Sequence, residues 1–519
     1  MTISTPSRSL AGKRILIFQQ RGWGMAIGHD IARQLHEHGA SLAALTFRHD
    51  VDRFVRDQDQ VPYELILSND AIMNNPEQLL GNDSISLDEV CENLELTSIW
   101  ELVQSLRNHV KSYKDKFYYG FKQQASDEMI ISYVKACYKC IRNVFDEFAP
   151  EFIVSPNFVA LPHIMFNLYA RKHGVPMTGI SDSKVQDLLY FSYSYLEDRG
   201  PFIDRCAQIQ QGADSPSLDK AQAYIAKLRN SFSNVLPSTV VETRNTMTQK
   251  AKAEILPYWF CLRYLLRKEW RYQDATGPTF KNPPPRYILR DHYARKRNSV
   301  AAESLSHYYD LDSLDDFAFF PLQYQPEESI DVHAARHNNQ LETARQIAMS
   351  LPGDMTLAVK DHPEMVELRP HTYLEKLART PNVKLLHYAT PTKELLERTR
   401  LVIAPTGTTI FEAVLMHKPV VQLGPLGKTL MLPNVTHHTD FATLGEVITA
   451  ILNQPMDIEE HDRKLDAYIA AMYDVGFTLD YYGVVEAGHK EHKQKAVDLF
   501  VNEALRHLAA DSKSRSVAR

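Results

Sequence analysis

Two polar segments in the C-terminal half contain residues that can bind a phosphorylated ligand. Gln325 offers an amide that can both donate to and accept from a base or a sugar, on a loop that Pro326 makes rigid. Further along, Lys360 and His362 can neutralise a phosphoryl group, His362 can act as an acid, and Pro363 stiffens the turn. The alternative for His362 is a solvated surface histidine. Its place directly after a predicted strand favours the functional interpretation.

A third segment combines small and hydroxyl residues at the predicted start of a helix. Thr406, Gly407, Thr408 and Thr409 lead into this helix, whose first N–H groups have no partner within the helix and suit a phosphate. Glu412 lies in the first turn, where its carboxylate can accept both hydroxyls of a ribose. The pair Thr409 and Glu412 also fits a capping box, which requires no ligand. The two roles are compatible.

Each of these three segments follows a predicted strand. From residue 317 onward, short apolar runs alternate with helical patterns, which predicts a parallel sheet covered by helices. The predicted strands span 317–320, 357–360, 383–386, 401–404 and 420–423, and the helices between them 331–350, 370–378, 391–398 and 409–416. Ligands bind beyond the carboxyl ends of the strands in such sheets. We therefore expect the three segments to meet at one edge.

The N-terminal segment begins with the same rhythm. A strand at 14–18, a glycine-bearing loop, a helix at 29–38 and a further strand form a βαβ unit. Gly22, Gly24 and Gly28 resemble a dinucleotide-binding fingerprint, but the last spacing is wrong. We predict that the backbone of this loop comes close to a bound ligand, which is either an acceptor or a phosphate of a donor.

Two aspartates are candidates for the general base. Asp182 lies just past a predicted strand at 175–180, and Asp30 lies at the start of the helix after the glycine loop. Both are expected to face the cleft. The alternatives are that Asp30 only favours a helix N-terminus and that Asp182 caps a turn.

The predicted fold class is α/β, with two Rossmann-like domains facing a cleft, a helical insertion and a C-terminal helical segment. We expect an N-terminal Rossmann-like domain at 1–184. A mainly helical insertion or hinge follows at 185–312, and a C-terminal Rossmann-like domain at 313–455. Helices and a frayed tail complete the chain at 456–519.

The predicted insertion contains a stretch that is rich in aromatic and basic residues. Residues 252–297 hold 11 Lys and Arg against 4 Asp and Glu, and residues 259–271 mix aromatics with cations. Such a pattern can lie on an anionic membrane face or grip an acidic glycan. A buried helix with snorkelling Arg and Lys is the alternative.

Composition excludes several classes of protein. A net charge of −6 argues against nucleic-acid binding, and no apolar run approaches the roughly 18–20 residues that span a bilayer. The apolar run at 15–18 is too short for a signal peptide, and five cysteines fit a reducing compartment. We predict a cytoplasmic protein, peripheral at most at the inner membrane, with no metal site and no cofactor.

Two local signals do not meet the motifs that they suggest. Gly424 to Thr429 looks like a phosphate loop, but it is too short for the Walker A spacing. Cys137 and Cys140 form a CxxC without a second pair, in a helical stretch where buried thiols are expected.

Together, the motifs of the C-terminal half resemble the bacterial capsule polysaccharide biosynthesis family, which includes the β-Kdo transferases. The resemblance rests on Gln325-Pro326, His362-Pro363 and the segment from Thr406 to Glu412, over roughly residues 317–424. It implies the GT-B glycosyltransferase fold and a metal-independent transferase that uses a nucleotide-sugar, often CMP-Kdo. By that resemblance Gln325, His362 and Glu412 contact the nucleotide or its phosphate, while Lys360 and the helix start at Thr408-Thr409 stabilise the leaving group. The resemblance also implies that the C-terminal domain at 313–455 binds the nucleotide-sugar and that the N-terminal domain at 1–184 is on the acceptor side. The implied acceptor is a surface or capsular glycan or its lipid-linked precursor.

Several alternatives remain open from the sequence. A related transferase of the teichoic-acid type would move a polyol phosphate, but it would require a second histidine where Thr406-Gly407 stands. A sugar-nucleotide epimerase shares the two-domain layout. A non-catalytic scaffold of a polysaccharide assembly complex belongs to a different class, and a dinucleotide-dependent oxidoreductase is disfavoured by the glycine spacing.

Overall fold

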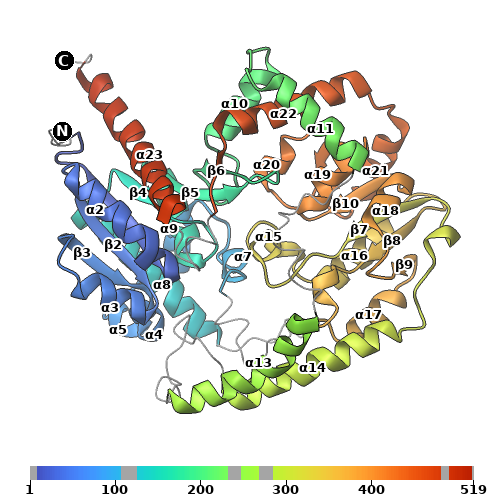
Figure 1. The fold of residues 1–519 in the computed structure, drawn as a ribbon, viewed down its shortest axis with the longest axis horizontal. Helices are drawn as coiled ribbons and strands as arrows, with labels where there is room; N and C mark the ends of the chain where they lie inside the picture. The colour runs from blue at the N-terminus through green and yellow to red at the C-terminus, as the bar shows by residue number, and fades with distance from the viewer. Residues whose placement is uncertain (1–8, 107–125, 232–246, 268–283, 481–489, 517–519) are drawn as a thin grey trace.

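The computed structural model describes residues 9–106, 126–231, 247–267, 284–480 and 490–516. Two largely parallel β-sheets, each with helices on both faces, form two halves of the molecule (Figure 1). The predicted α/β class with two Rossmann-like domains is therefore confirmed. Of the helices in the described ranges, none has both the length and the apolar character needed to cross a membrane.

The N-terminal sheet has seven strands in the order β13-β6-β5-β4-β1-β2-β3. Its strands are β1 Arg14–Gln20, β2 Ser41–Phe47, β3 Tyr63–Ser68, β4 Phe152–Val154, β5 Met177–Asp182, β6 Leu188–Ser192 and β13 Phe477–Thr478. The strands from β5 to β3 pair in parallel, whereas β6 is antiparallel to β5 and to β13. β1 lies inside the sheet, between β4 and β2, and it is apolar on both faces, as a doubly covered strand must be.

Alternation along β1 assigns the helices to the two faces of this sheet. Leu16 and Phe18 pack into the core formed with α8 and α9, whereas Ile15 and Ile17 pack against α2 and α23. The helices of this half are α1 Arg21–Trp23, a π-helical turn at Gly24–Gly28, α2 His29–Glu37, α3 His49–Asp57, α4 Asn69–Asn74, α5 Pro76–Leu80, α6 Leu87–Leu94, α7 Trp100–Val103, α8 Asp127–Asn143, a second π-helical turn at Val144–Phe148 and α9 Leu161–Lys172.

The C-terminal sheet is entirely parallel, in the order β12-β11-β10-β7-β8-β9. Its strands are β7 Phe317–Pro321, β8 Thr356–Lys360, β9 Val383–Leu386, β10 Leu401–Ala404, β11 Val420–Gln422 and β12 Val435–His437. Its helices are α15 Glu328–Asp331, α16 Gln340–Ser350, α17 His371–Ala378, α18 Thr392–Arg398, α19 Thr408–Leu415, α20 Gly427–Leu430, α21 Leu444–Asn453 and α22 Ile458–Val475.

The remaining helices connect the halves. α10 Pro201–Gln210 and α11 Leu218–Ser231 pack on α22 and share its apolar core, so they belong to the C-terminal half. α13 Met247–Leu266 and α14 Pro285–Glu303 form a hairpin at the edge of the molecule. α23 Lys490–Ser516 returns to the N-terminal sheet, where it lies beside α2 (Figure 1).

All five strands predicted for the C-terminal half form, with bounds within one residue. Four strands were not predicted: β3, β6, β12 and β13. Because β6 pairs with β5, the domain boundary predicted at residue 184 falls inside the N-terminal sheet, and the predicted insertion begins with a strand rather than a helix. The predicted glycine loop at 21–28 is helical in the structure, because its backbone packs directly onto β1.

Candidate functional site

A cavity of about 620 Å³ lies between the two halves, at the carboxyl ends of their strands. This is the position where open α/β sheets bind ligands, and the volume is that of a small-molecule site. The N-terminal half contributes residues that include Asn157, Asp182, Lys184 and Glu197, and the C-terminal half residues that include Glu327, His333, Gly407, Thr408 and Lys428.

Lys428 joins the two halves at the wall of this cavity. Its Nζ lies 2.8 Å from Glu197 Oε2 and donates to the carbonyl oxygen of Asp182 at 2.8 Å. The hydroxyl of Tyr190 donates to the same Glu197 oxygen at 2.6 Å. Burial opposes the ionisation of Glu197, but Lys428 outweighs it and lowers the pKa of Glu197 below its ordinary value. The interface between the halves is therefore built around a buried ion pair.

Gly427 allows this approach because it has no side chain. Its N–H donates to the carbonyl of Leu196 at 2.8 Å, and a Cβ placed on it would lie 2.4 Å from the Cα of Asp198. Any larger residue would push the two halves apart. The segment that fails the Walker A spacing thus serves to close the two halves onto each other.

Asp182 lines the cavity, as expected of a candidate base. Its carboxylate pairs with Lys184 at 2.6 Å. Burial raises the pKa of Asp182, but the charges of Lys184 and Lys428 outweigh this effect, so the pKa lies below its ordinary value. Asp182 is consequently a carboxylate at neutral pH, available to accept a proton.

His333 also lines the cavity, and sequence reasoning missed it. Its imidazole is buried, and Nε2 lies 3.7 Å from Glu328 Oε1. Burial lowers the pKa of His333 to about 4, so the ring is neutral at physiological pH. His333 and Glu197 belong to no motif in the sequence. Lys428 was indicated only by the phosphate-loop-like segment Gly424 to Thr429, after a strand end.

The loop before α19 reaches the cavity with Gly407 and Thr408. Gly407 has φ +108°, and a Cβ there would lie 2.5 Å from Gln323 Oε1, so only glycine fits. The hydroxyl of Thr406 donates to the carbonyl of Ser329 at 2.7 Å, which ties this loop to the loop after β7. The start of α19 therefore faces the cavity, as the sequence predicted, while Thr409 lies one residue further into the helix.

The side chain of Gln325 forms its hydrogen bonds inside the protein and does not line the cavity. It is 2% exposed, its Nε2 donates to the carbonyl of Asn338 at 3.0 Å, and its Oε1 accepts from Gln340 Nε2 at 3.2 Å. The peptide bond to Pro326 is cis. Glu327, the next residue, is the one that lines the cavity. Gln325-Pro326 thus shapes the loop that presents Glu327.

Lys360 and His362 lie behind the cavity wall. Lys360 Nζ donates to Thr392 Oγ1 at 2.8 Å and to the carbonyl of Thr390 at 3.0 Å, and burial lowers the pKa of Lys360. His362 Nδ1 accepts from the N–H of Glu364 at 3.2 Å, and burial lowers the pKa of His362. The charge of Glu327 acts on His362, so the His362-Pro363 turn borders the loop that reaches the cavity.

Glu412 lies in the second turn of α19 and not in its first turn as predicted, and it is not among the residues that line the cavity. Its charged neighbour is Lys360. Burial raises the pKa of Glu412 to about 7, and Lys360 offsets this only in part. A carboxyl group that ionises near neutral pH is typical of functional sites, although structural networks also produce such shifts.

The raised pKa of Glu412 predicts a pH dependence of stability. Between pH 4.5 and about 7 the folded state keeps a proton that the unfolded chain has lost, so Glu412 destabilises the fold as the pH rises. Glu412→Gln should therefore flatten the decline of the unfolding free energy over this range, measured by urea denaturation at several pH values. Glu394→Gln, on α18, is the control. A wild-type slope unchanged by Glu412→Gln would assign the titration to another group.

The structure places Asp30 and the three glycines away from the residues that line the cavity. Asp30 pairs with Lys493 of α23 at 2.7 Å. A Cβ on Gly28 would lie 2.1 Å from Gln19 Oε1, and one on Gly24 would lie 3.0 Å from Val51 Cγ1. Gly24 and Gly28 thus serve close packing within the N-terminal half, and Gly22 lies in the same helical turn of α1. Of the two candidate bases, Asp182 alone is at the cavity.

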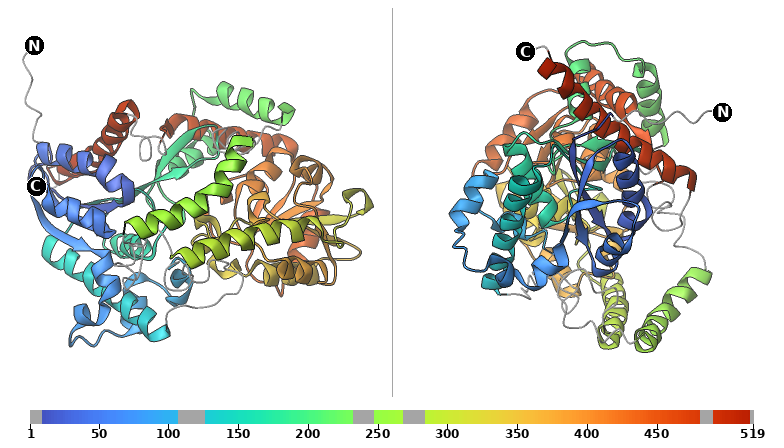
Figure 2. Two further views of the ribbon diagram at one scale, coloured as in Figure 1. Left: turned by 60° about the horizontal axis from the view of Figure 1, so that its bottom comes forward. Right: turned by 90° about the vertical axis from the view of Figure 1, so that its left-hand side faces the viewer.

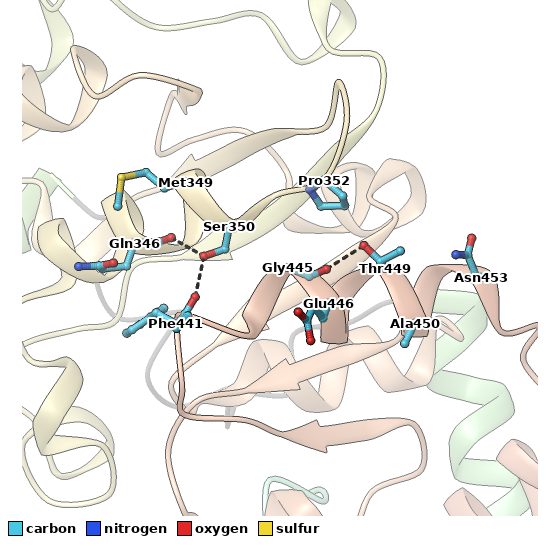
Figure 3. Close-up of a pocket in the computed structure, with 11 residues that line it drawn as sticks. Gln346, Met349, Ser350, Pro352, Phe441, Gly445, Glu446, Thr449, Ala450 and Asn453 are labelled. Carbon is cyan, nitrogen blue, oxygen red and sulfur yellow. Dashed lines mark hydrogen bonds between the residues drawn. The ribbon is translucent and has the colours of Figure 1, made fainter.

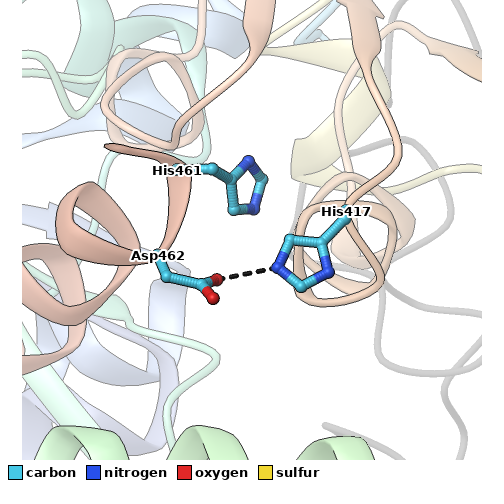
Figure 4. A group of neighbouring side chains, drawn as sticks. All are labelled: His417, His461 and Asp462. Carbon is cyan, nitrogen blue, oxygen red and sulfur yellow. Dashed lines mark hydrogen bonds and ion pairs between the residues drawn. The ribbon is translucent and has the colours of Figure 1, made fainter. Parts of the chain in front are cut away.

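A cluster of possible metal ligands lies elsewhere, at the end of α19 and the start of α22. The ligand atoms of His417, His461 and Asp462 lie within 4.8 Å of one another (Figure 4). The guanidinium of Arg229 donates to Asp462 Oδ1 at 2.6 Å and lies 2.9 Å from His417 Nε2. His461 Nε2 contacts the carbonyl of Val414 at 2.9 Å. Arg229 already neutralises this cluster, so we assign no metal centre to it.

A second hollow, of about 930 Å³, lies between α16 and α21, away from the strand ends (Figure 3). The hydroxyl of Ser350 lies 2.9 Å from the carbonyl of Gln346, one turn earlier in α16, and 3.2 Å from the carbonyl of Phe441, in the segment before α21. Glu446 is the charged residue in its lining. None of the predicted site residues lies there.

Comparisons with known proteins bear on the C-terminal half. The family model for capsule polysaccharide biosynthesis proteins matches residues 268–426. This match contains all three polar segments, so the resemblance that they indicated is confirmed. No curated protein matches the chain significantly.

Solved structures resemble the chain over most of its length. The KpsC β-Kdo 2,7 transferase of Thermosulfurimonas dismutans is 12% identical, with 78% of this chain and 97% of that chain covered and a TM-score of 0.34. UDP-GlcNAc 2-epimerases are also similar. That of Neisseria meningitidis, bound to UDP-GlcNAc, is 12% identical with 89% and 98% covered and a TM-score of 0.24. That of Methanocaldococcus jannaschii is 12% identical with 89% and 99% covered and a TM-score of 0.24. TM-scores this low do not support any conclusion about this protein. Its fold is assigned from the strand order of the two sheets.

Proposed function

We propose that the protein is a glycosyltransferase that moves a sugar, Kdo from CMP-Kdo, to a surface or capsular glycan or its lipid-linked precursor. The observation that carries the proposal is the cavity between the halves, at strand ends that lie within the region matched by the capsule family model. The family match supports the substrate class, and the two-domain fold supplies separate sides for donor and acceptor.

In this proposal the C-terminal half holds the donor. The leaving nucleotide gains negative charge as the glycosidic bond breaks, and the first N–H groups of α19 at Thr408 are placed to compensate it. Lys428 lies on the same wall, where Glu197 neutralises its charge. The first N–H groups of α19, with Lys360 and His362 behind the wall, would stabilise the departing nucleotide without a metal ion or a cofactor.

The N-terminal half would present the acceptor. Asp182 is an ionised carboxylate at the cavity and would accept the proton of the attacking hydroxyl. The neutral imidazole of His333, on the C-terminal side of the cavity, has one unprotonated nitrogen and would offer a second acceptor. The five cysteines are free thiols, which supports a cytoplasmic site of action.

A nucleotide panel tests the donor proposal. We expect CMP to raise the melting temperature, and CMP release from CMP-Kdo to require a glycan acceptor. Stabilisation by CDP instead would favour polyol-phosphate transfer, and stabilisation by UDP with interconversion of UDP-sugars would favour an epimerase. Stabilisation by NAD alone would contradict the proposal. No change of melting temperature with any of these nucleotides would also contradict it and would favour a scaffold.

His362→Ala is expected to lower turnover by about a hundredfold, the usual loss for a positioned acid or phosphate-binding histidine. Stability should change little, because the ring accepts one hydrogen bond, from the N–H of Glu364. Turnover and melting temperature are measured on the same preparation. His371→Ala, at an exposed position on α17, is the matched control. Unaltered turnover in His362→Ala would remove this residue from the site.

A further inference from the structure

Helix α13 carries an apolar stripe that the described part of the chain leaves uncovered. Ile255, Trp259, Leu262 and Leu266 recur at helical spacing, and 66%, 53%, 47% and 68% of their surfaces are exposed. Tyr264, on the opposite side of the helix, is only 4% exposed. α13 therefore packs through one side and presents an apolar face to its surroundings.

Exposed large apolar side chains concentrate on this one element. Seven of the 17 such residues in the described ranges belong to α13, where Leu256, Tyr258 and Leu265 join the stripe. Scattered apolar residues on a surface are ordinary, but a contiguous set on one helix face marks an interaction site. The sequence alternative of a buried, snorkelling helix is thereby excluded for residues 254–267, while residues 268–271 of that stretch lie outside the described residues.

α14 holds α13 at a distance from the sheets. The side chain of Asn298 donates to the carbonyl of Glu367 at 3.1 Å, and Ala302 packs into the core of the C-terminal sheet. α13 packs in turn on α14, so both helices lie at the edge of the molecule, outside the two sheets (Figures 1 and 2). A flat partner can reach the stripe in this position.

The hairpin is basic in an acidic protein. Residues 254–267 and 284–303 contain seven Lys and Arg against three Asp and Glu, whereas the whole chain has a net charge of −6. Glu254 is paired with Lys296, and Asp291 with Arg290 at 2.7 Å. Arg267, Arg286 and Arg297 are exposed. The exposed surface of the hairpin thus attracts an anionic partner.

We propose that the α13–α14 hairpin docks on an anionic lipid bilayer, with α13 lying in the interface. Its 20 residues form a rod of about 30 Å that would lie along the membrane rather than cross it. Trp259 and Tyr258 suit the headgroup level, the aliphatic residues suit the acyl boundary, and the arginines suit lipid phosphates. A second copy of the chain fits less well, because it would bring two basic hairpins together.

Vesicle flotation of the whole protein tests this proposal without donor or acceptor, so its result is independent of the proposed activity. We expect the protein to float with vesicles of phosphatidylcholine mixed with phosphatidylglycerol and to stay behind with phosphatidylcholine alone. Trp259→Ser, Leu262→Ser and Leu266→Ser combined should lower the bound fraction by roughly tenfold or more. Arg267→Glu, Arg286→Glu and Arg297→Glu combined should do the same and abolish the salt dependence.

The control for the apolar variant is the combination of Leu218→Ser, Met349→Ser and Ile458→Ser, three exposed apolar residues on other helices. This control should float like the wild type. The proposal is overturned if the wild type floats with neither vesicle, or if the apolar and charge variants both float undiminished. It is also overturned if the wild type ignores vesicles and sedimentation shows the apolar variant converting a dimer to a monomer, since the stripe is then a self-contact.

Discussion

Lys428→Met should destabilise the fold by about 3–5 kcal/mol, because it leaves the buried carboxylate of Glu197 without its counter-ion. The ion pair spans 2.8 Å, and its two side chains are 9% and 6% exposed, so water cannot replace the ammonium group. Lys428 also donates to the carbonyl of Asp182, and the variant loses this contact between the halves. Urea denaturation of wild type and variant measures the difference.

The pH dependence of this loss identifies Glu197 as its source. In the wild type the pKa of Glu197 is lowered, so its contribution to stability is present above pH 4.5 and is lost as the pH falls through the folded-state pKa. Without Lys428, burial is opposed by the Tyr190 hydrogen bond and by His333, and it should raise the pKa of this carboxyl group above 4.5. The variant should then lose stability as the pH rises, and its deficit should be smaller at pH 5 than at pH 8.

Two further variants make this result specific. Adding Glu197→Gln to Lys428→Met should recover most of the stability, because no charge then remains buried. Lys393→Met removes a lysine from an exposed pair with Glu397 on α18 and should have little effect. If Lys428→Met were as mild as Lys393→Met, the ion pair between the halves would contribute nothing to stability.

Arg369→Met is the second substitution for which we expect a large effect, again about 3–5 kcal/mol of stability. Arg369 is fully buried, its Nε donates to Asp361 Oδ1 at 2.7 Å, and its Nη2 donates to the carbonyl of Gln323 at 2.8 Å. Burial already raises the pKa of Asp361, and Arg369 acts against this rise. Thermal and urea denaturation measure the loss.

Arg369→Met should also disturb the proposed donor site. Asp361 accepts from the N–H of His362 at 2.8 Å, so the ion pair holds the backbone of the His362-Pro363 turn. We expect weaker nucleotide binding in Arg369→Met even where the variant is folded. Arg369→Lys should rescue poorly, because an ammonium group cannot donate in the two directions that the guanidinium serves.

Arg345→Met is the matched control, since Arg345 forms an exposed pair with Glu342 on α16. It should leave both stability and nucleotide binding nearly unchanged. Equal effects of the two arginine substitutions would show that the Asp361–Arg369 pair supports neither the fold nor the turn.

Local pattern was enough to predict the parallel sheet of the C-terminal half. Its strands are short apolar runs bounded by turn residues, and its helices repeat at helical spacing, so each element is encoded within its own segment. β6 and β12 were missed for the opposite reason. β6 lies in a stretch that was predicted to be helical, and it is an antiparallel addition to a parallel sheet. β12 is a three-residue edge strand in which two residues are polar, so it lacks the apolar run of the inner strands.

The candidate site was also predicted only in part. The loops that reach the cavity were predicted, because carboxyl ends of neighbouring parallel strands must converge. Which side chain each loop presents was not predicted. Gln325 turns inward to Asn338 and Gln340, and its neighbour Glu327 faces the cavity instead. A difference of one residue along a loop depends on packing that the local sequence does not encode.

The sequence alone thus determined the two sheets of this protein, the three polar segments at their strand ends and the family that the C-terminal half resembles. The tertiary structure decided the partners: Lys428 with Glu197 across the halves, His333 at the cavity, and Asp30 with Lys493 rather than with a ligand. These pairs join residues far apart in the chain, and their energies depend on burial, which exists only once the chain has folded.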